Sequence, residues 1–265
     1  MINFYKQVCD FHKAFDLPLR SEPDKLVFDD KKLCKLRFDL IKEEIGELND
    51  AINTRDFIEI IDALSDIMYV VYGCGASFGI DLNESFMNML CCNYNIYNLH
   101  DFGFKKNNYS HFDIVVKYSR TVNKLTPELN VFDNVDMMEQ LNKYTDKFKY
   151  YINKLKKYIY LLPNMKEIEN VLNNILKNVF DIGVFLGIDL NKSYNIVHES
   201  NITKLCKTEK EAIETVEWYK NNEKRYDTPS YKKSKNGTDW IIYNESSDKI
   251  LKSINYKVAN FQSML

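Results

Sequence analysis

Glycine and proline are scarce in this sequence, with 8 and 5 residues in a chain of 265. Both residues interrupt regular structure, so their scarcity favours long uninterrupted elements. Long apolar runs are missing as well, because the uncharged stretch at residues 67–80 is bounded by Asp66 and Asp81 and is too short to cross a bilayer. Charged residues also interrupt residues 1–15, which therefore lack a signal-peptide core. We expect no membrane partner and a cytoplasmic location.

The sequence also lacks an excess of either charge. Its 36 Lys and Arg residues balance 38 Asp and Glu residues, which removes the basis for a global electrostatic grip on nucleic acid. The cysteines show neither CxxC spacing nor the density of a disulfide scaffold, so we expect reduced thiols and no zinc site. They are Cys9, Cys34, Cys74, Cys91, Cys92 and Cys206. No Walker lysine loop, GxGxxG string or nucleophile elbow occurs.

Apolar residues recur at spacings of three and four over long stretches, which predicts an all-α fold. The expected helices cover residues 2–15, 30–53, 56–78, 83–97, 112–124, 135–161, 165–186, 191–204 and 207–222. Gly79 and Gly187 are expected to cap two of these helices at their C-termini. Near the C-terminus, residues 240–243 and 249–254 predict the two strands of a small β-hairpin, preceded by a loop at residues 226–237.

The string GIDLN at residues 79–83 recurs at residues 187–191, an offset of 108. With one residue of slippage, the apolar positions Ile41, Ile45, Leu48 and Ile52 fall on Phe148, Ile152, Leu155 and Ile159. Chance similarity between two amphipathic segments is the alternative, but identical strings with matching flanks are hard to obtain from periodicity alone. We predict a tandem duplication of a four-helix unit, forming a dimer-like bundle within one chain. The expected parts are a first repeat (1–99), a linker (100–111), a degenerate second repeat (112–206), and a C-terminal helix, loop and hairpin (207–265).

Acidic residues gather in two neighbouring predicted helices. They are Glu43, Glu44 and Glu47 in one helix and Glu59, Asp62 and Asp66 in the next. Residues three or four apart share a helix face, so each helix presents carboxylates in one direction, and two such helices side by side make a cup of acids. A hard divalent cation is the usual remedy for so much negative charge, and Mg²⁺ prefers oxygen ligands.

A solvated helix face is the alternative interpretation of these acids. Two observations favour a site instead. Asp62 and Asp66 interrupt an otherwise apolar stretch, where a free carboxylate is costly. The second repeat keeps its apolar face but has lost almost all of these acids, so they are not needed merely to build the bundle. In the alignment, Glu43, Glu44 and Glu47 become Tyr150, Tyr151 and Lys154, while Asp62 and Asp66 become Asn170 and Asn174.

Four segments together resemble the all-α nucleoside triphosphate pyrophosphohydrolase superfamily, which includes MazG-like enzymes, dimeric dUTPases and phosphoribosyl-ATP pyrophosphohydrolases. They are FHKAFDLP (11–18), LIKEEIGEL (40–48), EIIDALSDIMYVVYG (59–73) and GIDL (79–82). The resemblance covers residues 1–97 well and residues 112–206 in degenerate form. The tail at residues 249–256 resembles hairpin tails of MazG-like proteins from phages and large DNA viruses, which would place the protein in host cytoplasm or a viral factory.

This resemblance implies Mg²⁺-dependent hydrolysis of a nucleoside triphosphate to a monophosphate and pyrophosphate, with Mn²⁺ as a substitute. It assigns the metal to Glu44, Glu47, Glu59 and Asp62, with Asp66 as an additional acid. The implied catalytic acids are Glu43, Glu44 and Glu47, and Glu43 could orient or deprotonate the attacking water. Asn201 and Lys204 would reach phosphate or sugar oxygens from the second repeat.

Other residues give weaker indications. His12, Phe11 and Phe15 could line a base pocket, although aromatic residues at helical spacing more often belong to a core. Lys249 and Lys252 could contact phosphate, but lysines on a hairpin are more often solvated surface.

The leading hypothesis is nucleotide pool sanitation or dNTP control, with dUTP, dCTP or a damaged dNTP as substrate. One alternative is phosphoribosyl-ATP hydrolysis, which the duplication and hairpin disfavour. The other is a nucleotide-binding or partner-binding module without turnover. A homodimer stays open, because remaining apolar faces could pair again.

Overall fold

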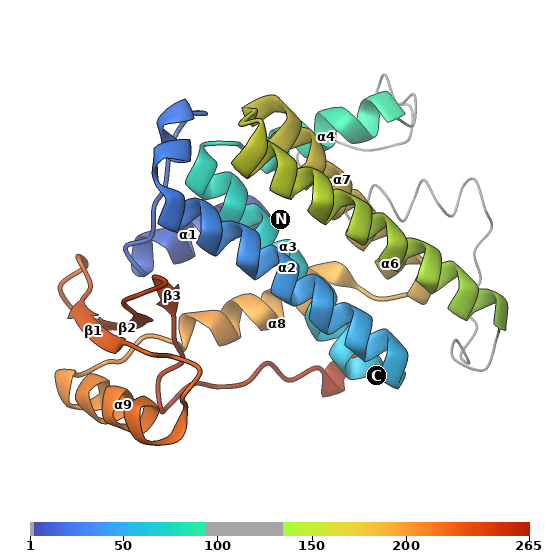
Figure 1. Cartoon of the computed structure of the whole chain (residues 1–265). Helices are drawn as coiled ribbons and strands as arrows, with labels where there is room; N and C mark the ends of the chain where they lie inside the picture. The colour runs from blue at the N-terminus through green and yellow to red at the C-terminus, as the bar shows by residue number, and fades with distance from the viewer. Residues whose placement is uncertain (1–2, 94–134) are drawn as a thin grey trace.

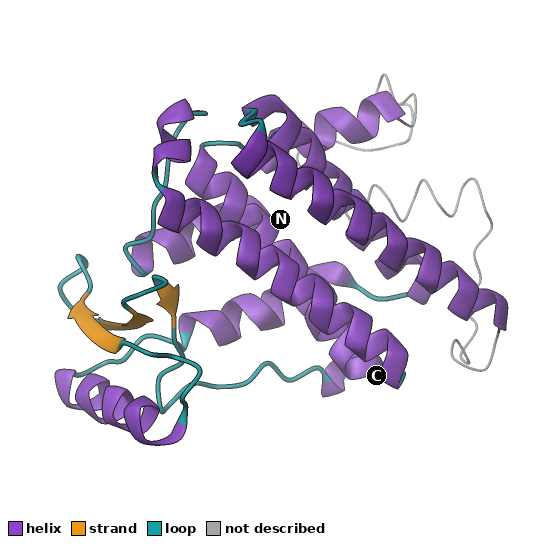
Figure 2. Cartoon of the chain, in the orientation of Figure 1, coloured by secondary structure: helices purple, strands orange, loops and turns teal. Residues whose placement is uncertain are grey.

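The computed structural model describes residues 3–93 and 135–265. Within these residues lie eight α-helices and a small three-stranded sheet (Figures 1 and 2), which confirms the all-α fold with a C-terminal β element. The helices are α1 (Phe4–Ala14), α2 (Lys31–Thr54), α3 (Phe57–Phe78), α4 (Leu82–Asn93), α6 (Val135–Lys156), α7 (Met165–Leu186), α8 (Leu190–Ile202) and α9 (Glu209–Asn222). The helix expected at residues 112–124 lies outside the described residues.

Local signals set the ends of α2 and α3. Asp30 Oδ1 accepts a hydrogen bond from the Leu33 amide at 2.9 Å, and Asp56 Oδ1 accepts one from the Glu59 amide at 3.1 Å. Each aspartate thereby satisfies a free N–H group of the first helical turn. Gly79 ends α3 with φ of 77°, and a Cβ at this position would lie 1.9 Å from the Glu22 carbonyl oxygen. Only glycine fits there, as the sequence predicted.

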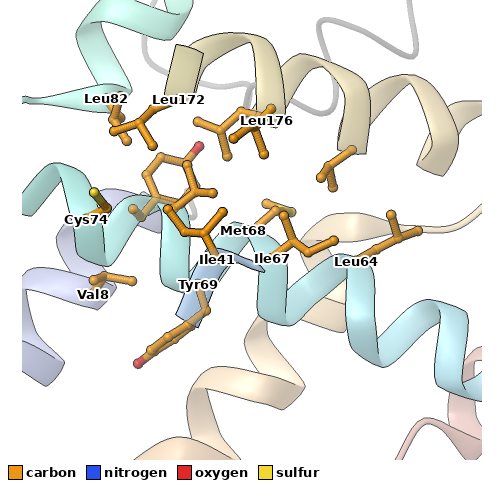
Figure 3. Packing of buried hydrophobic residues seen from close by; sticks show 14 of the residues in the cluster. Val8, Ile41, Leu64, Ile67, Met68, Tyr69, Cys74, Leu82, Leu172 and Leu176 are labelled. Atoms are coloured by element: carbon orange, nitrogen blue, oxygen red, sulfur yellow. The ribbon is translucent and has the colours of Figure 1, made fainter. Parts of the chain in front are cut away.

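The apolar helix α3 lies among α1, α2, α7 and α8 and forms much of the core. Leu64, Ile67 and Tyr72 are fully buried in it. Figure 3 shows Tyr69 on the opposite side of the α3 ribbon from Leu172 and Leu176 of α7. One face of α3 therefore packs into the bundle, while another faces α1 and α8.

The two halves of the bundle make reciprocal contacts. Ser65 Oγ of α3 donates to Ser193 Oγ of α8 at 2.7 Å, and Ser85 of α4 bonds Asn173 of α7 at 3.1 Å. The offset of 108 residues places Ser65 on Asn173 and Ser85 on Ser193, so each contact maps onto the other. Reciprocal pairs of this kind arise wherever two similar units pack around a two-fold axis. The division of the chain into repeats and a linker stays a prediction.

The C-terminal sheet has the strand order β1-β2-β3 and is antiparallel throughout, with β1 at Pro229–Lys233, β2 at Trp240–Asn244 and β3 at Lys249–Ile250. The prediction of a loop at residues 226–237 is wrong, because β1 lies within it. The expected second strand is also shorter than residues 249–254. β1 is an edge strand that begins with proline and ends in two exposed lysines, so it has little of the apolar alternation that identifies a strand.

The sheet packs with α9 at one end of the bundle (Figure 1). Together they enclose a small second core of Cys206, Ala212, Val216, Tyr219, Ile242 and Leu251. After β3, the chain runs back along α8, where Ser200 Oγ donates to the Lys257 carbonyl at 2.7 Å and Thr203 accepts from the Lys257 amide at 2.9 Å. Tyr256, Val258 and Ala259 of this returning segment line a cavity together with residues of α2 and α3.

No single described helix is long and apolar enough to span a bilayer. Helices α7 and α8 taken together have the length and composition of a membrane span. The chain bends by 117° between them.

Candidate active site

A cavity of about 450 Å³ runs between α2 and α3, with α1, the end of α8, α9 and the returning C-terminal segment as its other walls. Five of the predicted acids line it: Glu43, Glu44, Glu47, Asp62 and Asp66. They come from the facing sides of two antiparallel helices, as the spacing of the acids predicted.

The acids of the two helices are close enough to repel one another. Burial and the charge of Asp66 raise the pKa of Glu44. Burial and the charge of Glu59 raise the pKa of Asp62, to which Glu47 also contributes. Burial and the charge of Asp62 raise the pKa of Asp66. The protein thus holds several carboxyl groups together in a partly dry site, where their negative charge lacks full compensation.

Three lysines line the same cavity as the acids. Burial lowers the pKa of Lys204, at the end of α8, whereas the charges of Asp66 and Glu44 work against this effect. Lys249 and Lys252 of the C-terminal segment line the same cavity. The sequence favoured solvated surface for these two lysines, since no spacing signal links the tail to α2. A cavity lined by both acids and lysines suits a ligand that carries both phosphates and a cation.

Glu43 differs from the other acids because it already has a partner. Its Oε2 lies 2.6 Å from Lys249 Nζ, and its Oε1 lies 3.9 Å from Arg225 Nη1. Glu43 therefore connects α2 to the C-terminal region at the edge of the cavity. Its predicted action on the attacking water stays a prediction.

The structure brings some of the other predicted residues into the cavity and leaves two outside. Asn201, 6% exposed, and His12, 1% exposed, both line it. Glu59 does not line the cavity but lies exposed in the first turn of α3, from where its charge acts on Asp62. Phe15 is fully buried beneath Phe11, with ring centroids 4.1 Å apart, so it belongs to the core.

His12 is held in one orientation at the end of the cavity away from the acids. Its Nδ1 donates to the Pro18 carbonyl oxygen at 2.8 Å. Burial lowers the pKa of His12 to about 3, and the nearby Arg37 charge acts in the same direction. The imidazole is therefore neutral, with Nε2 free to accept a hydrogen bond.

The donor set fits a hard divalent cation. Glu44, Glu47, Asp62 and Asp66 offer only oxygen donors, which Mg²⁺ prefers, and their mutual repulsion is what a cation would relieve. Among the residues that the structure describes, no three acidic, histidine or cysteine side chains already stand in a metal-coordinating arrangement. The fit therefore rests on the donor chemistry and on the uncompensated charge.

An all-α bundle whose EExxE and ExxD helices lie beside one cavity agrees with the superfamily that the four sequence segments resemble. Residues 8–89 match the phosphoribosyl-ATP pyrophosphohydrolase family. The chain is also similar to an uncharacterized protein of Acanthamoeba polyphaga mimivirus, with 34% identity over 265 residues, covering 98% of this chain and 95% of the relative. No solved structure matches the chain. The chain belongs to the MazG-like nucleoside triphosphate pyrophosphohydrolase superfamily, as its motifs predicted, and enzymes of this group generally depend on divalent metals.

Proposed function

We propose that this protein hydrolyses the bond between the α and β phosphates of a nucleoside triphosphate, releasing a monophosphate and pyrophosphate with the help of Mg²⁺. One observation carries the proposal: the acids of α2 and α3 and three lysines from the C-terminal half line one cavity. Such a site can take a polyanion together with a divalent cation, which is what a nucleoside triphosphate brings. Mn²⁺ would serve as a substitute.

Each wall has its own role in this reaction. Glu44, Glu47, Asp62 and Asp66 would hold Mg²⁺, which supplies charge neutralisation at the phosphates and a bound water of lowered pKa. Lys204 and Lys252 would bind phosphate oxygens from the opposite side, with Asn201 beside them.

The positions of Glu59 and Glu43 change the roles that we propose for them. Glu59 would act on the site only through its charge, since it lies outside the cavity. Glu43, already paired with Lys249, would orient the attacking water and hold the C-terminal wall in place.

Product analysis tests the reaction itself. The purified protein is incubated with Mg²⁺ and a panel of canonical, uracil-containing, oxidised and inosine triphosphates, and the products are separated. Monophosphate with pyrophosphate is expected. Diphosphate with phosphate would place the cleaved bond elsewhere and contradict the proposal. Metal-dependent binding without any product would favour a module that only binds nucleotide.

Matched variants test the acid wall. Glu47→Gln and Asp62→Asn are expected to lower kcat/KM by at least about 10- to 100-fold, the range for disturbing the shell of a metal site. Glu167→Gln in the first turn of α7 is the control, because it removes a carboxylate that does not line the cavity. Glu167→Gln is expected to leave turnover unchanged, and full activity in Asp62→Asn would overturn the assignment.

Thermal unfolding tests metal binding without turnover. Saturating Mg²⁺, at about 100 times its Kd, stabilises a folded protein by about 2.7 kcal/mol and so raises its Tm. Asp66→Asn is expected to unfold at a higher temperature than the wild type in the presence of chelator, because it removes one repelling charge. The rise caused by Mg²⁺ is expected to be smaller in the variant, and equal rises would exclude Asp66 from the site.

The biological setting that we propose is control of a nucleotide pool, in the cytoplasm or a viral factory, since the mimivirus relative supports a protein of viral type. The name of the matching family favours phosphoribosyl-ATP as a second candidate substrate. Adding it to the panel decides between the two, because pyrophosphate released from phosphoribosyl-ATP alone would replace the dNTP assignment.

A further inference from the structure

Arg37 is a buried cation without a counterion. It is 4% exposed, yet it lines the cavity from α2. Within the described residues no carboxylate lies at ion-pair distance from it, and its Nε has no hydrogen-bond partner. Its Nη2 lies 3.4 Å from His12 Nε2, a long contact. A guanidinium held in this way destabilises the fold unless something else uses it.

His12 sets the direction of this guanidinium. Because the His12 Nδ1 proton is engaged by the Pro18 carbonyl, Nε2 is an acceptor and faces the Arg37 side chain. Gly73 of α3 makes the space, since a Cβ there would lie 3.1 Å from Arg37 Nη1 and 3.3 Å from His12 Nε2. Arg37 lines the cavity, and a guanidinium offers a ligand hydrogen-bond donors and no acceptor.

The position of Arg37 relative to the acids suits one end of a nucleotide. Arg37 precedes Glu44 by seven residues on the same face of α2, which separates them by roughly 10 Å along the axis. On α3, Gly73 follows Asp66 by the same seven residues. The cavity therefore extends along both α2 and α3, from the acids to Arg37 and Gly73. A ligand with its phosphates at the acids and lysines would therefore extend its other end toward Arg37.

The walls around Arg37 suit a flat ring. Phe11 and Tyr69 line this end, with ring centroids 5.4 Å apart and the rings nearly perpendicular. Val8 and Leu40 add apolar surface. Apolar and aromatic walls around a few polar donors are the ordinary lining of a small-molecule site.

We propose that Arg37, oriented by His12, is a specificity-determining residue that selects nucleobases with a carbonyl oxygen at the position where adenine and cytosine carry an amino group. This inference rests on the proposed function and names its substrate class as keto-base nucleotides. The amino group of adenine or cytosine and the Arg37 guanidinium are both hydrogen-bond donors. Neither would find an acceptor in the other, so binding of these bases is disfavoured.

Paired substrates test the selection. We would measure kcat/KM for pyrophosphate release from dUTP against dCTP and from dITP against dATP. The wild type is expected to prefer the keto member of each pair. Arg37→Met is expected to lower kcat/KM for the keto members about 10- to 100-fold, as for a lost hydrogen bond to a charged group, with little change for the amino members. Equal losses on both members, or unchanged ratios, would overturn the inference.

Two further variants serve as a control and as a second test of the selection. Arg20→Met removes an arginine whose Nη1 donates to the Ser77 carbonyl at 2.6 Å, away from the cavity lining, and is expected to leave the ratios unchanged. Arg37→Lys keeps the charge but loses the planar fork, so it also should lose the preference. Should Arg37→Met fail to fold, Arg37→Lys decides the question by the same ratios.

Binding without turnover separates this inference from the proposed function. Equilibrium binding of dUMP, dCMP and tripolyphosphate is measured for the wild type and Arg37→Met. If no triphosphate is hydrolysed but dUMP still binds better than dCMP through Arg37, the proposed reaction fails and the base selection stands. If Arg37→Met weakens tripolyphosphate as much as dUMP, Arg37 is a phosphate ligand and the selection is wrong.

Discussion

Lys249 Nζ lies 2.6 Å from the Glu43 carboxylate and joins β3 to the middle of α2, 206 residues away in the chain. The two side chains are 27% and 34% exposed, so the pair stands at the edge of the cavity rather than in its depth. Through this pair the C-terminal segment is held against the acid-bearing helices. The segment that carries Lys252 is therefore held against α2 in part by a contact that a single substitution can remove.

Lys249→Met is expected to raise KM by up to about fivefold with a smaller change in kcat, because a partly exposed ion pair contributes up to about 1 kcal/mol. The same variant should expose the C-terminal segment to faster proteolysis. Lys35→Met is the matched control, since Lys35 pairs with Asp39 on the outer surface of the same helix. Identical KM values and cleavage rates in the two variants would show that the Glu43–Lys249 pair does not hold the segment.

The pH dependence of stability gives a test at His12. The folded protein keeps His12 neutral down to about pH 3, whereas the unfolded chain protonates it near its ordinary pKa of 6.5. The unfolded state therefore binds the additional proton as the pH falls. The contribution of neutral His12 to stability is complete above pH 6.5 and is lost between pH 6.5 and pH 3, at up to about 1.4 kcal/mol per pH unit.

His12→Asn keeps a donor for the Pro18 carbonyl but does not titrate. The free energy of unfolding of this variant, measured by denaturant titration from pH 7 to pH 4, is expected to fall less steeply than that of the wild type. Because all other groups are shared, the difference between the two curves isolates His12. Parallel curves would show that His12 is protonated in the folded protein.

The acids other than Glu59 line one cavity, and this grouping could be predicted from the sequence because helical spacing is a local property. Glu44 and Glu47 must share a face of α2, and Asp62 and Asp66 must share a face of α3, once both segments are helical. Spacing does not say what packs opposite. Phe15 was therefore offered as a base contact although it lies in the core beneath Phe11.

Arg37, which the sequence analysis missed, and Lys252, which it favoured as solvated surface, both depend on distant contacts. In the sequence, Arg37 is indistinguishable from the other charged residues of its helix. Its contact with His12 of α1 exists only in the folded structure. Lys252 reads as a surface lysine, and it lines the cavity only because the C-terminal segment returns along α8. The edge strand β1 was missed for a different reason, since its pairing with β2 replaces the apolar pattern that it lacks.

The paired contacts between the halves predict equal coupling energies. Ser65 and Ser193 are fully buried and share a hydrogen bond of 2.7 Å, while Ser85 and Asn173 share one of 3.1 Å. Double-mutant cycles with alanine are expected to give about 1 kcal/mol for each pair, the usual net value of such a bond. The coupling energies are measured by denaturant unfolding. Strong coupling in only one of the two pairs would contradict equivalent packing of the two halves.

Alanine variants of two helical glycines, Gly46 and Gly73, distinguish the effect of helix propensity on stability from the effect of crowding in the cavity. Gly46 of α2 has nothing within 4 Å of an added Cβ, so Gly46→Ala should raise the free energy of unfolding by about 1 kcal/mol, the helix-propensity difference. Gly73→Ala gains the same propensity, but its Cβ would crowd Arg37 Nη1 at 3.1 Å and His12 Nε2 at 3.3 Å. Its net gain should be smaller or reversed, and turnover of keto-base substrates should fall, while Gly46→Ala keeps wild-type kcat/KM.

Denaturant titrations and kinetics on both variants make the comparison direct. If Gly73→Ala gains as much stability as Gly46→Ala and keeps its turnover, then Arg37 and His12 can move aside without consequence. A pair that moves freely cannot discriminate between a carbonyl and an amino group, because discrimination requires donors held in place before the ligand arrives. The stability of one alanine variant thus bears on the rigidity that the base selection requires.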